Sequence, residues 1–181
     1  GDGGWSGLDQ DVAAELAARG IPVMGFNSLR YFWQARTPEQ TSADVQRVIV
    51  QAMRRFDRSR VVLIGYSFGA DVLPFVINRL PPLLRSKLAS VNLLGLSHDA
   101  VFEIKVADWV TGGRQRDDTQ SVVEEIRRMP ALPARCFWGE GEDDDPCPTL
   151  PAQRIAQQQV GHGHHFSGDA VALVDRILAP G

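Results

Sequence analysis

Hydrophobic positions follow two different periods along the chain, and their alternation predicts helices separated by strands. Apolar residues recur at helical spacing in Leu8–Leu16 and again in Val45–Met53. Short apolar runs typical of buried parallel strands lie between such stretches. The expected helices cover residues 7–20, 37–56, 69–80, 119–129 and 168–178. The expected strands cover residues 21–26, 60–67, 88–97, 134–139 and 154–160, with 101–110 as a half-exposed edge strand.

This order of elements indicates a three-layer α/β fold, with a mostly parallel sheet between helices on both faces. Functional loops are then expected at the carboxyl ends of the strands. The chain of 181 residues shows no internal repeat, low-complexity tract or flexible linker. We therefore expect one domain, residues 1–181.

Composition narrows the class of partner. Hydrophobic residues make up 44% of the chain and charged residues 23%, and the formal net charge is −3. This balance is typical of a globular protein and gives no electrostatic reason to expect nucleic acid. No apolar run approaches the roughly 18 residues of a transmembrane helix.

Two cysteines, Cys136 and Cys147, flank the acidic loop "CFWGEGEDDDPC". A bridge between them would close a short loop and would require an oxidising compartment. The alternative is two unrelated buried thiols. We expect the disulfide, which favours the periplasm.

The stretch Gly65–Gly69 fits G-x-S-x-G, the nucleophile elbow, with Ser67 as the nucleophile. The turn pushes the serine side chain out above the sheet, and small residues at positions 65 and 69 keep the strand and helix from colliding. The expected strand before it and helix after it supply the context that the motif needs. An ordinary structural serine is the alternative.

A catalytic acid is expected in the loop that follows strand 134–139, because nucleophile-elbow hydrolases present serine, acid and histidine in that chain order. The spacing to the proline favours Asp144. At most one carboxylate of this loop can take the role, since the acid must be half-buried to orient a histidine. The other candidates are Asp143 and then Asp145, and a wholly solvated loop is the remaining alternative.

The general base is expected in "GHGHHFSGD", the loop before the last helix. Histidine can accept and return a proton near neutral pH. Its position favours His164, with His165 and His162 as alternatives. Three histidines and an acidic loop could also bind a metal, but the spacing matches no strong zinc motif. We expect neither a metal ion nor a cofactor.

The glycine-rich start "GDGGW" is typical of a loop that donates a backbone N–H to an oxyanion. One expected donor is the backbone N–H of Phe68. The other is the backbone N–H of Asp2, with Gly3 as the alternative to Asp2. The strand that should precede this loop is absent from the sequence. We expect a cut there rather than a sheet that has lost its first strands.

With these residues in place, the chain resembles the VirJ/AcvB family of bacterial virulence proteins, an α/β-hydrolase group. The resemblance spans nearly the whole chain, and "SLRYFW" followed by "TPEQ" is its most specific part. The matching segments are Gly1–Trp5, Ser28–Trp33, Thr37–Asp44, Gly65–Asp71 and Gly163–Asp169.

The resemblance implies a periplasmic serine esterase of the α/β-hydrolase fold, connected with hydrolysis of lysyl-phosphatidylglycerol and with type IV secretion. Tyr31, Phe32 and Trp33 could form an apolar wall beside the lipid, or simply pack against helices. Asp71 could attract the lysyl group, or serve as a structural helix residue.

Two other functions fit the same residues. The first is a secretion-associated binding protein that keeps the fold, and the second is a general hydrolase of small esters. Across these functions, the expected partners are a small-molecule or lipid ester, the membrane surface and secretion-system proteins.

Overall fold

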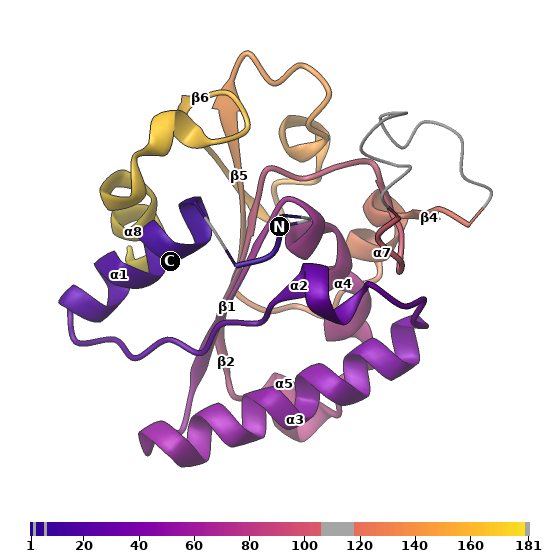
Figure 1. Cartoon of the computed structure of the whole chain (residues 1–181). Helices are drawn as coiled ribbons and strands as arrows, with labels where there is room; N and C mark the ends of the chain where they lie inside the picture. Colours follow the sequence, from indigo (N-terminus) through magenta and orange to yellow (C-terminus); the bar gives the residue numbers. More distant parts are fainter. Residues whose placement is uncertain (2, 6, 106–117, 180–181) are drawn as a thin grey trace.

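A four-stranded parallel sheet forms the centre of the molecule, with the strand order β1-β2-β5-β6 (Figure 1). The computed structural model describes residues 1, 3–5, 7–105 and 118–179. The strands are β1 (Val61–Tyr66), β2 (Leu88–Leu94), β5 (Ala134–Glu140) and β6 (Ala156–His162). Leu63 pairs with Val91, and Leu93 with Cys136. A short antiparallel pair, β3 (Asp99–Ala100) and β4 (Gln120–Ser121), lies outside this sheet.

Helices cover both faces of the sheet, as Figure 1 shows. One face carries α1 (Leu8–Ala18) and α8 (Ala170–Leu178), which pack on each other. The other carries α3 (Pro38–Phe56), α4 (Phe68–Arg79) and α7 (Val122–Arg127). The short elements are α2 (Ser28–Tyr31), α5 (Pro82–Arg85) and the 3₁₀ turns η1 (Cys147–Thr149) and η2 (Phe166–Gly168).

The sheet divides the core into two clusters because neighbouring strand residues point to opposite faces. Leu94 and Phe137 are buried with α1 and α8. Leu93 and Cys136 are buried with α3, α4 and α7. This arrangement confirms the three-layer α/β fold that the sequence predicts.

Helix α3 illustrates how local sequence sets an element's start. The Thr37 side chain accepts a hydrogen bond from the Gln40 N–H, and the Gln40 side chain accepts one from the Thr37 N–H. This capping box satisfies two backbone donors, and Pro38 fits the first helical position, which needs no donor. The helix ends at Phe56, and the next residue, Asp57, has a left-handed backbone conformation.

Two of the expected strands are wrong where they can be checked. Residues 21–26 form no strand, and most of them line an apolar pocket together with residues of β1. Residues 101–105 form no strand either, and 106–110 lie outside the described residues. The expected helix at 119–129 is shorter, because β4 occupies its start.

The described part of the chain contains no helix that is both long enough and apolar enough to cross a membrane.

Candidate active site

Ser67 stands on a sharp turn between β1 and α4. Its backbone has φ 52° and ψ −124°, a conformation that residues other than glycine rarely adopt. A methyl group at Gly65 would lie 2.5 Å from the Gly69 carbonyl oxygen, so position 65 requires glycine. Position 69 is different, since a methyl group there would meet no described atom within 4 Å. The turn therefore has the strained geometry of a nucleophile elbow, and the predicted need for a small residue is confirmed at position 65 only.

The structure brings Ser67 and His164 together, although 97 residues separate them in the chain. Ser67 Oγ and His164 Nε2 are 2.8 Å apart, and His164 Nδ1 is 2.9 Å from Oε1 of Glu142. A carboxylate can only accept a hydrogen bond, so the Nδ1–H of His164 donates to Glu142. The same tautomer leaves Nε2 free of a proton and able to accept from the Ser67 hydroxyl. This geometry can activate a serine nucleophile.

The acid in contact with His164 is Glu142, so the prediction of Asp144 does not agree with the structure. Asp144 and the first alternative, Asp143, are exposed, whereas the side chain of Glu142 is 19% exposed. The spacing to the proline pointed to Asp144.

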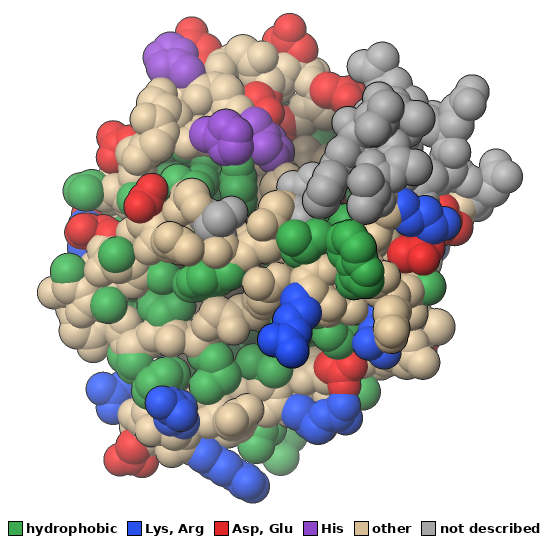
Figure 2. All heavy atoms as spheres, in the orientation of Figure 1, with side chains coloured by type: hydrophobic (Ala, Val, Ile, Leu, Met, Phe, Trp, Pro, Cys, Tyr) green, Lys and Arg blue, Asp and Glu red, His purple; other side chains and the backbone are tan. Residues whose placement is uncertain are grey.

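The three histidines at and after the end of β6 have different partners. His165 Nδ1 lies 2.6 Å from the Tyr66 hydroxyl, and His162 Nδ1 lies 3.0 Å from the exposed carboxylate of Glu140. His164 is thus the one that reaches the serine. Figure 2 shows histidines and acidic side chains in the upper half of one face, and most Arg and Lys side chains in the lower half.

The oxyanion donors can be placed in part. Phe68 is the first residue of α4, where backbone N–H groups have no acceptor within the helix. The positive end of the helix dipole also favours negative charge there. Asp2 lies outside the described residues, and the alternative donor Gly3 is exposed. A methyl group at Gly1 would lie 3.9 Å from Ser67 Cβ, so the glycine-rich loop begins beside the serine.

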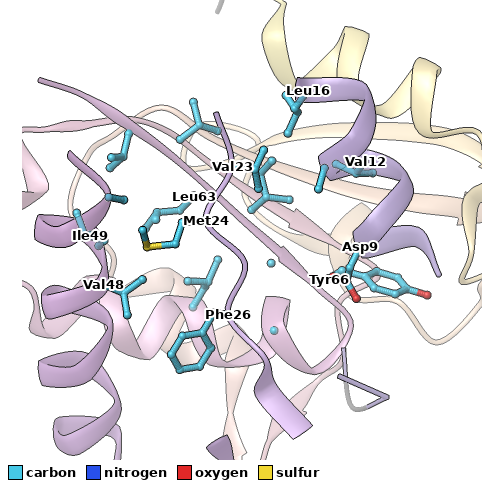
Figure 3. A pocket seen from close by; sticks show the side chains of 18 of the residues that line it. Asp9, Val12, Leu16, Val23, Met24, Phe26, Val48, Ile49, Leu63 and Tyr66 are labelled. Carbon is cyan, nitrogen blue, oxygen red and sulfur yellow. The ribbon is translucent and has the colours of Figure 1, made fainter. Parts of the chain in front are cut away.

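An apolar pocket of about 420 Å³ adjoins the serine turn (Figure 3). It runs along β1 between α1 and α3, and Gly65, Tyr66 and Gly69 contribute to its lining. Aliphatic side chains from several elements form much of the wall: Val12, Leu16, Val23, Met24, Val48 and Leu63. A pocket of this size and character suits an apolar group.

Tyr31 and Trp33 do not line this pocket, whereas Phe26 and Phe32 do. The Tyr31 hydroxyl donates to Asp44 Oδ2 at 2.5 Å, and burial, followed by this contact, raises the pKa of Tyr31 to about 12. Trp33 is 55% exposed. Of the three residues predicted for an aromatic wall, only Phe32 lines the pocket, while Tyr31 packs against Phe26 and Phe32.

Asp71 is buried in α4 rather than exposed at the pocket mouth, which disagrees with its predicted role in attracting a cationic substrate. Its Oδ1 accepts the Ser97 N–H at 2.8 Å. Burial raises the pKa of Asp71 to about 7. The structure thus favours the alternative that Asp71 is a structural helix residue.

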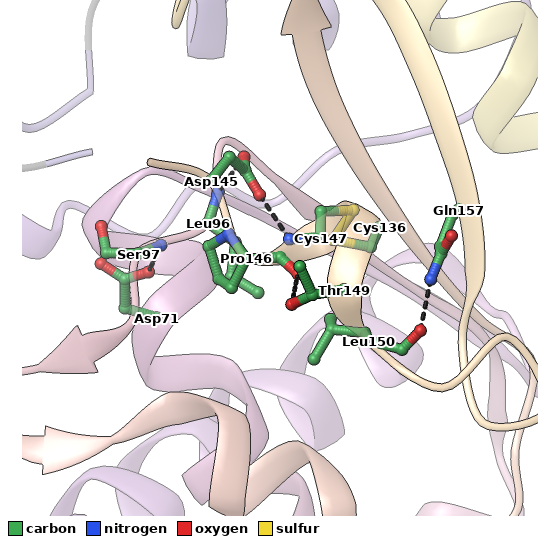
Figure 4. The surroundings of a disulfide bond; sticks show 10 residues. All are labelled: Asp71, Leu96, Ser97, Cys136, Asp145, Pro146, Cys147, Thr149, Leu150 and Gln157. Atoms are coloured by element: carbon green, nitrogen blue, oxygen red, sulfur yellow. Dashed lines mark hydrogen bonds between the residues drawn. A yellow bond between two sulfur atoms is a disulfide. The ribbon is translucent and has the colours of Figure 1, made fainter. Parts of the chain in front are cut away.

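Asp145, the third candidate acid, is also buried, and both of its oxygens bind backbone N–H groups. Oδ2 accepts from Leu96 at 3.0 Å, and Oδ1 accepts from Cys147 at 2.8 Å (Figure 4). Burial raises the pKa of Asp145 to about 6. With both oxygens engaged, Asp145 is not the acid that binds His164.

The expected disulfide between Cys136 and Cys147 is present (Figure 4). It joins β5 to the turn η1 and closes the loop that carries Glu142. The bond therefore fixes both ends of the acidic loop to the sheet.

The layer order, the parallel sheet and the serine turn together make up the α/β-hydrolase fold. The family described as "Bacterial virulence protein (VirJ)" matches residues 1–180, so the chain belongs to the VirJ family. No curated protein matches the chain. The thioesterase domain from the curacin biosynthetic pathway is similar in structure, with a TM-score of 0.61 at 15% identity over 94% of this chain and 85% of that chain.

A second similar structure is an extracellular α/β-hydrolase from a Paenibacillus species, which shares homology with tobacco salicylic acid binding protein 2. Its TM-score is 0.49 at 14% identity, over 94% of this chain and 95% of that chain.

Proposed function

We propose that this VirJ family member is a serine hydrolase that cleaves ester bonds with a triad of Ser67, His164 and Glu142. The observation that carries the proposal is the continuous pair of hydrogen bonds from Ser67 Oγ through the imidazole to Glu142 Oε1. The strained backbone of Ser67 supports it, because strain of this kind concentrates at functional sites.

The chemistry follows from these contacts. Ser67 Oγ attacks the ester carbonyl carbon while His164 Nε2 takes the hydroxyl proton. Glu142 holds the ring and stabilises the imidazolium that forms. The Phe68 N–H stabilises the oxyanion, and we propose the Asp2 N–H as the second donor. His164 then gives its proton to the leaving alcohol, and a water molecule, activated by the same histidine, releases the acyl group from Ser67.

We propose an aminoacyl ester of a phospholipid, such as lysyl-phosphatidylglycerol, as the substrate. Exposed carboxylates of the acidic loop, among them Asp143 and Asp144, favour a cationic group near the site. The apolar pocket beside Ser67 favours a substrate with an apolar portion. The disulfide supports an oxidising compartment, in agreement with a periplasmic location.

Hydrolysis of lysyl-phosphatidylglycerol vesicles by the wild type and by Ser67→Ala tests this function. We expect the variant to lose at least about 10³-fold in kcat, since a triad nucleophile normally contributes that much. A short ester such as p-nitrophenyl butyrate, tested in parallel, separates the lipid substrate from a general esterase.

Secretion measured in cells carrying Ser67→Ala tests the alternative of a binding protein. If hydrolysis and secretion both persist, the catalytic account fails.

A further inference from the structure

Two buried carboxylates hold consecutive backbone N–H groups in the loop that follows β2. Asp145 binds Leu96, and Asp71, which lies one helical turn after Ser67, binds Ser97. The two aspartates are 8% and 7% exposed. Buried carboxylates that accept backbone N–H groups fix the chain, and these hydrogen bonds are charge-assisted when the carboxylate is ionised.

The loop of residues 95–97 lies against the ring of His164, the proposed general base, and is called the floor below. Gly95 has φ +64°, and a methyl group there would lie 2.8 Å from His164 Cε1 and 3.1 Å from Nδ1. The Gly95 N–H donates to the Phe137 carbonyl oxygen at 2.9 Å, which ties the floor to β5. Because Leu96 directly follows Gly95, a small displacement of Leu96 would move the backbone on which the imidazole rests.

Asp145 joins this floor to the loop that holds the other side of the ring. Its second oxygen binds the N–H of Cys147, which is bonded covalently to Cys136 on β5. Three residues before Asp145, Glu142 binds His164 Nδ1. One short segment, residues 142–147, thus both orients the imidazole and secures the floor beneath it.

We propose that Asp145 is a positioning residue for His164, acting through the Leu96 N–H and the Gly95 backbone. The inference rests on the proposed function, in which His164 is the general base. It assigns a task to a carboxylate that has no part in the triad. Asp71 holds the neighbouring N–H but has no bond to the segment that carries Glu142, so its effect on the ring is smaller.

Asp145→Asn tests the assignment. The amide has one acceptor oxygen, so either Leu96 or Cys147 loses its acceptor. Asp71→Asn is the matched control, because a single oxygen can still accept the Ser97 N–H. The rate of Ser67 labelling by a fluorophosphonate, kcat and KM for p-nitrophenyl butyrate, and the melting temperature are measured for both variants.

We expect Asp145→Asn to fold, to label about 10- to 100-fold more slowly and to change kcat far more than KM, since a small misplacement of a catalytic group costs about this much. Asp71→Asn should stay within about threefold of the wild type. Wild-type labelling in folded Asp145→Asn, or an equal loss in both variants, would overturn the inference. If Asp145→Asn does not fold, Asp145→Glu replaces it, and labelling of this variant at the wild-type rate is the overturning result.

A second readout does not depend on activity. The proton on His164 Nδ1, bonded to Glu142, should give a downfield NMR signal in the wild type and in Asp71→Asn, and this signal should shift or vanish in Asp145→Asn. Wild-type protein that shows the signal but never labels would contradict the proposed function. An unchanged signal in Asp145→Asn would contradict the positioning role.

Discussion

The imidazole of His164 rests against the backbone of Gly95, with no room between them for a methyl group. Gly95 follows β2 and His164 follows β6, so the contact joins the ends of two strands that do not pair with each other. Position 95 therefore controls where the imidazole of His164, the proposed general base, can lie.

Gly95→Ala should reduce catalysis at this contact. The new methyl group would displace the ring, and the positive φ adds backbone strain of about 1 kcal/mol or more. We expect kcat/KM for p-nitrophenyl butyrate to fall at least about tenfold, as for other misplaced catalytic groups. Circular dichroism should show a folded protein. Unchanged kcat/KM would mean that the ring can shift without loss of function.

Glu142 and Asp144 should respond very differently to neutral substitutions. Glu142→Gln removes the carboxylate that fixes the His164 tautomer, and we expect kcat to fall by about 10²- to 10⁴-fold. Asp144→Asn changes an exposed side chain and should stay within about twofold, as surface changes usually do. The two kcat values, measured on the same ester, compare the acids directly. The reverse order of effects would restore Asp144 as the catalytic acid.

Much of this site could be predicted from the sequence because the turn motif, strand order and chain order of the chemical groups are local or topological properties. Ser67 and His164 came from such patterns. The acid could not be fixed in this way, because four acidic residues follow one another at Glu142–Asp145 and their burial depends on how the disulfide-closed loop folds back. Gly95 was missed as well. Its one local signal was a glycine directly after an apolar strand, and its contact lies 69 residues away.

The strand predicted at residues 21–26 shows the limit of apolar runs as a signal. The run lines a pocket with β1 but forms no strand, because a strand needs a hydrogen-bonding neighbour in addition to apolar side chains. The sequence pattern carries no information about that neighbour.

The disulfide should contribute to stability by restricting the unfolded chain. Cys136 and Cys147 are 11 residues apart, and the chain-entropy model gives about 3 kcal/mol for a loop of this length. We expect the double variant Cys136→Ser/Cys147→Ser to lose about this much free energy of unfolding in urea, relative to the oxidised wild type. The wild type under reducing conditions is the control and should approach the variant. Equal stability of all three would show that the bond adds nothing.

Asp71 should make stability depend on pH. Burial raises its pKa from 3.8 to about 7, so the folded protein binds a proton that the unfolded chain releases at lower pH. This contribution to stability is fully present below about pH 4 and is lost as the pH rises through about 7. The nearby carboxylates of Asp145 and Asp99 raise the pKa in the same direction.

Asp71→Asn removes this titration while keeping an acceptor for the Ser97 N–H. The wild-type melting temperature should therefore fall more between pH 5 and pH 8 than that of the variant. Parallel melting curves for the two proteins across this range would contradict the assignment, because the other titrating groups are common to both.

Mass spectrometry after reaction with a fluorophosphonate tests the central claim most directly, because the reagent modifies only a serine whose hydroxyl has been activated. The wild type should carry one adduct, located at Ser67, while His164→Ala should label at least about 10³-fold more slowly and Ser67→Ala not at all. Folded wild-type protein without an adduct, or an adduct on another residue that persists in Ser67→Ala, would contradict the account.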